Sequence, residues 1–61
     1  MKTLVIRNKE TGKTAQWILS KGEWLKTALR NYASYKYPYG ISVSQEYAEK
    51  HYEIIEVKNN D

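Results

Sequence analysis

The only histidine of this 61-residue chain, His51, follows two nearby carboxylates, Glu46 and Glu49. A protein metal site needs several His, Cys or carboxylate ligands that converge on one ion, and these residues supply half a site at most. Cations are favoured near the last carbonyls of a helix, so we interpret His51 as a helix-terminal residue. The sequence therefore predicts no metal and no cofactor.

Ser42 and Ser44 are the hydroxyl groups that stand near His51 in the chain. Nucleophilic catalysis needs an activated Ser, Thr or Cys with a base within reach, but serines just before a helical segment are better explained as caps. The three glycines are scattered, whereas a phosphate-binding loop needs them clustered. We expect no enzyme and no small-molecule substrate.

Tyrosines dominate the segment between positions 32 and 39, which holds four of them around the single proline. Tyrosine offers a large, rigid contact area with a polar tip and is enriched at binding hot spots. We place Tyr32 in the core. The others either form a lid over a small core or an exposed binding surface. If this surface binds a partner, the candidate residues are Arg30, Tyr35, Lys36, Tyr37 and Tyr39.

The length of 61 residues predicts one small domain of marginal stability. The chain has no cysteine, which excludes disulfides and favours the cytoplasm. No apolar run is long enough for a signal peptide or a membrane span. We therefore expect a soluble cytoplasmic protein that does not act on membranes.

Charge is divided unevenly along the chain. Residues 1–39 hold eight Lys and Arg against two Glu, a balance of +6, whereas residues 40–61 hold two Lys against five acidic residues, a balance of −3. Such asymmetry can mark a basic face for an acidic partner. It is equally consistent with an ordinary solvated surface.

The first half of the chain predicts a β-hairpin followed by a helix. Residues 3–7 and 13–19 have strand patterns, and the turn between them ends at Gly12. A helix is predicted over 21–35, because Ser20 and Glu23 have the spacing of a capping box and Leu19 and Trp24 that of a hydrophobic staple. Its apolar stripe is expected to comprise Trp24, Leu25, Ala28, Leu29 and Tyr32.

The second half is less clear. Residues 41–47 alternate as in a strand, but the residues that follow propagate a helix well, so we predict a short helix over 43–51 capped by Ser42. Residues 53–58 predict a third strand, and residues 59–61 a frayed tail.

These elements predict an α+β fold of ββααβ order, with a three-stranded antiparallel sheet of order 2-1-3 and the helices on one face. The helix-covered face should carry Leu4, Ile6, Ala15, Trp17, Leu19, Ile55 and Val57. The other face should carry a second set of binding candidates, Val5, Arg7, Ile18 and Ile54, with an apolar centre and a polar rim. The two outer strands leave open edges.

The sequence thus favours a non-enzymatic binding module. We expect a protein partner or a second copy of the chain, in the style of the small regulatory proteins of phages and mobile elements. The alternative is nucleic-acid binding, because Lys and Arg interleaved with tyrosines can follow phosphates and stack on bases.

Overall fold

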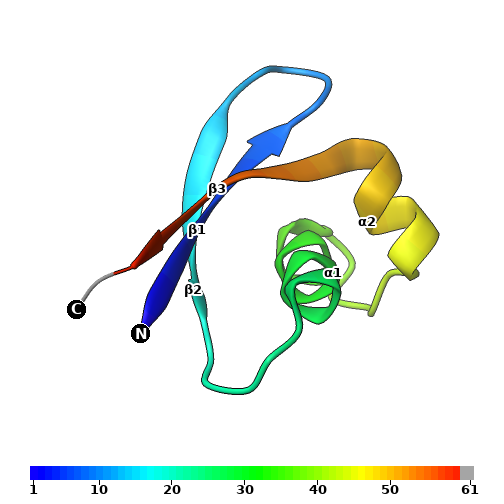
Figure 1. The fold of residues 1–61 in the computed structure, drawn as a ribbon. Coiled ribbons are helices and arrows are strands. Elements are labelled where there is room, and N and C mark those ends of the chain that lie inside the picture. The colour runs from blue at the N-terminus through cyan, green and yellow to red at the C-terminus, as the bar shows by residue number, and fades with distance from the viewer. Residues whose placement is uncertain (60–61) are drawn as a thin grey trace.

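The computed structural model describes residues 1–59 of the chain. The elements, in chain order, are β1 (Lys2–Asn8), β2 (Thr14–Leu19), α1 (Leu25–Lys36), α2 (Gln45–His51) and β3 (Tyr52–Asn59). The strands form one antiparallel sheet of order β2-β1-β3, and both helices lie on one side of it (Figure 1). The predicted ββααβ order and the 2-1-3 sheet are confirmed.

The core lies between β1 and the two helices. Leu4 and Ile6 on β1 are almost completely buried, and α1 and α2 contribute Ala28, Leu29, Tyr32, Ala33 and Ala48. Three of these seven residues are alanines, which lets the helix backbones approach closely. Because the chain has no phenylalanine, Trp17 and the tyrosines supply the large side chains around this centre.

The hairpin loop between β1 and β2 is closed by side chains of its own residues. Asn8 Oδ1 accepts hydrogen bonds from the backbone N–H groups of Glu10 and Thr11, at 2.8 and 3.2 Å. Gly12 has a φ of 76°, the left-handed conformation that glycine adopts without a steric penalty. Its N–H donates to the Asn8 carbonyl at 2.8 Å, which completes the expected turn.

The helix predicted over 21–35 begins later, at Leu25. Gly22 has a φ of 80°, which excludes it from a right-handed helix. Only part of the capping box forms: Glu23 Oε1 accepts from the Ser20 N–H at 3.2 Å, while the Glu23 N–H donates to the Ser20 carbonyl rather than to its hydroxyl. The pattern thus closes a turn before the helix. Trp24 precedes the helix and is 79% exposed, so its expected place in the apolar stripe is wrong.

Residues 45–51 form the short helix α2, and not a strand. Its cap is Ser44, whose Oγ accepts from the Tyr47 N–H at 3.1 Å. The prediction of Ser42 as the cap, with a helix start at 43, is therefore wrong by two residues. Either serine has a suitable side chain, and the chain path out of α1 decides between them.

The pairing of β1 with β3 contains a β-bulge that the sequence pattern did not indicate. Val5 lies opposite Glu56 and Ile6 lies opposite Ile54, so Ile55 has no partner on β1. One extra residue reverses the side-chain alternation beyond it. Ile54 consequently packs against the core and Ile55 is 49% exposed. The prediction that Ile55 faces the helices and Ile54 the open face is wrong.

The ends of the described chain add two observations. Asn59, expected in a frayed tail, is the last residue of β3, and the remaining two positions of that predicted tail lie outside the described residues.

Within residues 1–59, no helix is both long and apolar enough to cross a membrane.

Candidate binding surface

The segment from Tyr37 to Gly40 leaves the end of α1 as an ordered turn. Proline disfavours the helical conformation in the residue before it, and Tyr37 accordingly has extended backbone angles, φ −74° and ψ 125°. The Gly40 N–H then donates to the Tyr37 carbonyl at 3.3 Å. Pro38 at the second position and Gly40 at the fourth suit such a β-turn.

Hydrogen bonds fix the connector at both ends. The Tyr37 N–H donates to the Ser34 carbonyl at 3.2 Å. Beyond the turn, the Val43 N–H donates to Ser34 Oγ at 3.0 Å in a partly buried position. Ser44 then caps α2. Tyr37 and Tyr39 therefore project from a tethered loop, and Tyr35 projects from the last turn of α1, so the backbone of all three is ordered before any partner arrives.

Some of these tyrosines cover the core as a lid, and others form an exposed surface, which are the two roles considered from the sequence. Tyr35 and Tyr39 are 72% and 77% exposed, whereas Tyr32 is buried and Tyr37 is partly buried. Tyr37 is thus the lid residue. Tyr35 and Tyr39 form, with Lys36, the exposed surface that we call the tyrosine surface.

Each exposed tyrosine rests against another ring. Tyr35 lies 5.4 Å from Trp17, and Tyr39 lies 5.5 Å from Tyr37, as measured between ring centroids. Tyr37 in turn meets Tyr47 edge-on at 5.6 Å. Edge-on and tilted aromatic pairs at such distances are favourable. The two exposed rings therefore have a fixed side and a free side.

The basic candidates on α1 do not all join this surface. Lys36 is exposed between the two tyrosines in sequence. Arg30 is also exposed, but five residues along an α-helix correspond to about 140° of rotation, which places it on a different side from Tyr35. Tyr35, Lys36 and Tyr39 are all exposed at or just beyond the end of α1, whereas Arg30 lies on another side of that helix.

The sheet face without helices does not carry all of its predicted apolar residues. Ile54, a candidate for its apolar centre, lies on the opposite face because of the bulge. Val5 is partly buried, and Ile18, 58% exposed, is the main apolar residue that the register leaves open there. Arg7 is engaged by Glu53, with Nε donating to Oε2 at 2.8 Å. The predicted apolar centre of this second candidate surface therefore loses Ile54, while Val5 and Ile18 remain.

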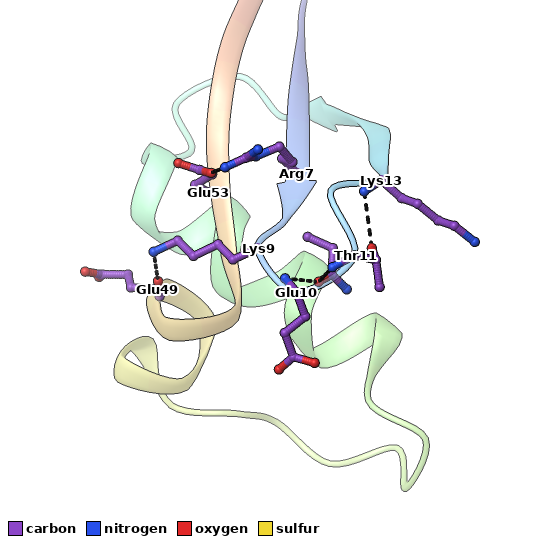
Figure 2. A network of polar contacts seen from close by, with 8 residues as sticks. Arg7, Lys9, Glu10, Thr11, Lys13, Glu49 and Glu53 are labelled. Atoms are coloured by element: carbon purple, nitrogen blue, oxygen red, sulfur yellow. Dashed lines mark hydrogen bonds and ion pairs between the residues drawn. The ribbon is translucent and has the colours of Figure 1, made fainter.

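Figure 2 shows how the hairpin loop holds the end of α2. Lys9 donates its backbone N–H to the His51 carbonyl at 2.9 Å and its Nζ to the Glu49 carbonyl at 2.7 Å. Helix ends leave such carbonyls unsatisfied, so these bonds stabilise the junction. His51 Nδ1 lies 3.0 Å from a carboxylate oxygen of Glu10. His51 thus has a structural role at the helix end, with a side-chain partner that the sequence did not predict.

Tyr52 lies behind this junction. Burial raises the pKa of its hydroxyl above the ordinary value of 10.0, and the neighbouring Tyr32, Tyr47 and Glu10 raise this pKa further. Its ring meets Tyr32 edge-on at 5.3 Å. The neutral form of Tyr52 is therefore favoured by the fold.

A further exposed group escaped the sequence prediction, which assigned its members to the core. Trp24, Leu25 and Val57 are all exposed. Hydrophobic periodicity cannot distinguish a buried helix start from an exposed one, so it placed Trp24 and Leu25 on the apolar stripe. Gly22 is the one residue that could have indicated a later helix start.

Within residues 1–59, no group of three or more His, Cys, Asp or Glu side chains could hold a metal ion. Searches of protein-family models, of curated proteins and of solved structures found no match to this chain.

Proposed function

We propose that this chain is a small non-enzymatic binding module that docks another protein on the tyrosine surface, acting in the cytoplasm as an adaptor, regulator or inhibitor. The observation that carries the proposal is the exposure of Tyr35 in the last turn of α1 and of Tyr39 on the tethered turn that follows. Exposed aromatic rings that are already held in place cost little entropy to bury, which is the property of rigid anchors at protein interfaces.

Lys36, which lies between these two anchors in the sequence, adds a charge. Its side chain is exposed at the end of α1. An interface with aromatic anchors and a positive charge suits a partner surface that has an apolar groove next to carboxylates. The proposed partner is therefore an acidic, partly apolar protein surface.

Nucleic-acid binding is the alternative, since Lys36 between two exposed tyrosines also suits stacking on bases. Three observations weigh against it. Arg7 is paired with Glu53, Lys9 is bonded to the end of α2, and Arg30 lies on another side of α1 from Tyr35. These three basic side chains thus do not extend the tyrosine surface into a path for a phosphate backbone.

Quantitative recovery of bound proteins from the source cell's lysate tests the proposal. The immobilised wild-type chain is compared with the double variant Tyr35→Ser/Tyr39→Ser and with Trp24→Ser. Trp24 is as exposed as Tyr39, at 79% against 77%, so it controls for the loss of an exposed aromatic ring. We expect one or more proteins that are recovered by the wild type and by Trp24→Ser but lost with the double variant.

Recovery that is the same for all three chains would contradict the proposal. A parallel titration with single- and double-stranded nucleic acid at low and moderate salt tests the alternative. Tight binding that falls steeply with salt, and that the double variant loses, would replace the protein partner with a nucleic acid.

A further inference from the structure

We propose that the outer edge of β2 pairs antiparallel with β2 of a second copy of this chain, which joins two three-stranded sheets into one continuous sheet. This pairing uses strand backbone rather than the exposed rings of Tyr35 and Tyr39. It does not depend on the protein partner proposed above.

Two backbone hydrogen bonds show which residues of β1 direct their N–H and C=O groups toward β2 and which direct them toward β3. The Asn8 N–H donates to the Lys13 carbonyl at 2.8 Å, and the Lys9 N–H donates to the His51 carbonyl at 2.9 Å. In antiparallel strands, bonded pairs alternate with non-bonded pairs. Even-numbered residues of β1 therefore bond to β2, and odd-numbered residues bond to β3.

The same alternation leaves three residues of β2 with backbone groups directed outward. Thr14, Gln16 and Ile18 lie opposite the odd-numbered residues of β1, so their N–H and C=O groups point away from it. β2 is an outer strand of the sheet, and all three side chains are exposed. Such a row of free backbone groups is a template for another strand.

The two outer strands differ in how well they are protected. β3 carries Glu53, Glu56 and Lys58 and is interrupted by the bulge at Ile55, and charges and bulges are devices that prevent edge pairing. β2 has the sequence TAQWIL, without a charge, a proline or a bulge. The edge of β2 is thus open and that of β3 is blunted.

A second copy fits this edge because β2 is complementary to itself. The residues with outward-directed backbone groups, Thr14, Gln16 and Ile18, must pair with the same set in the second copy. The register centred on Gln16 uses all three. Thr14 then lies opposite Ile18 of the partner subunit, and Gln16 opposite Gln16 of the partner subunit, where the two amides can exchange hydrogen bonds.

On the helix-covered face of the sheet, the same register places a small residue opposite a large one. Ala15 lies opposite Trp17 of the partner subunit, and Trp17 is only partly buried in the single chain. The pairing therefore brings no like charges together and covers an aromatic ring. Because each copy pairs through the edge of β2, the assembly closes at two chains and does not grow into a fibre.

Charge exchange at Gln16 tests the dimer and its register together. Sedimentation equilibrium of the wild type is expected to show a monomer–dimer equilibrium at concentrations up to millimolar. Gln16→Lys and Gln16→Glu each place like charges opposite one another and should weaken the dimer about fivefold. An equimolar mixture of the two variants should recover dimers, and native mass spectrometry should identify them as mixed.

Asn59→Lys adds the same charge to the other outer strand, where Asn59 is exposed, and should leave the dimer unchanged. Circular dichroism establishes that each variant is folded. A wild type that stays monomeric at millimolar concentration would overturn the proposal. Two Gln16 variants that dimerise as well as the wild type, or that fail to recover mixed dimers, would overturn it as well.

Discussion

Ile6 on β1 lies opposite Ile54 on β3, and the next residue of β3, Ile55, has no partner on β1. This relationship decides which isoleucine supports the fold. Ile54 packs against the core, whereas half of Ile55 is exposed to solvent.

Substitution of each isoleucine by alanine therefore has unequal effects. Ile54→Ala should lower the free energy of unfolding by about 2 kcal/mol, because it removes buried methyl groups. Ile55→Ala in the same strand should cost about 0.5 kcal/mol. Urea denaturation followed by circular dichroism measures both. A larger loss for Ile55→Ala would mean that β3 pairs without the bulge.

The two serines before α2 should also contribute unequally to the free energy of unfolding. Ser44→Ala removes the acceptor for the Tyr47 N–H and should cost about 1 kcal/mol of unfolding free energy. Ser42 has an exposed side chain outside the helix, and Ser42→Ala should be close to neutral. Thermal denaturation of the two variants provides the measurement. If Ser42→Ala were the more destabilising, the cap would be at the residue that the sequence favoured.

The two tryptophans also have different environments. Trp17 packs against Tyr32 at 5.4 Å and borders the core, so Trp17→Ala should cost about 3 kcal/mol. Trp24 is 79% exposed, and Trp24→Ala should change the stability by less than about 0.5 kcal/mol. Melting temperatures of both variants test this contrast. A strong loss with Trp24→Ala would indicate that it packs as the predicted hydrophobic staple.

The raised pKa of Tyr52 predicts a loss of stability in alkali. Below a pH of 10.0, the ordinary pKa of the hydroxyl, it is protonated in both the folded and the unfolded chain and contributes no pH dependence. As the pH rises above that value, the unfolded chain loses this proton more readily, so the free energy of unfolding falls. Tyr52→Phe should show a shallower fall than the wild type over this range. Equal slopes would mean that Tyr52 ionises normally in the fold.

The sequence was sufficient for the order of elements and the topology of the sheet. Those depend on strong local patterns: the alternation in β1 and β2, the helical spacing along α1, and the turn at Asn8 and Gly12. The 2-1-3 order then follows from general rules of connection. The short helix was predicted over 43–51 from propensity and capping residues, and it proved correct over residues 45–51.

The errors came from features that span several residues or two strands. A bulge changes the pairing of β3 with β1 and leaves no mark in the local pattern of isoleucines. The helix start depends on the left-handed Gly22, which converts a capping-box sequence into a turn. The cap of α2 depends on the path of the chain before that helix, which the hydrogen bond between Val43 and Ser34 helps to set.

The candidate surfaces were predicted in part. The exposure of Tyr35 and Tyr39 could not be read from the sequence, because it depends on the tertiary contacts of Tyr35 with Trp17 and of Tyr37 with Tyr47. The edge of β2 did have a sequence signal, the lack of any charge between Thr14 and Leu19. That signal predicts an open edge only when β2 is known to be an outer strand of the sheet.

Photocrosslinking from position 39 tests the central claim most directly. A benzophenone amino acid replaces Tyr39 in one chain and Trp24 in another, since both sites are similarly exposed. After irradiation in the source cell's lysate, adducts are identified by mass spectrometry. We predict covalent adducts with a distinct protein from position 39 and none with that protein from position 24. Equal labelling from both positions, or adducts with nucleic acid alone, would contradict the proposed protein-binding function.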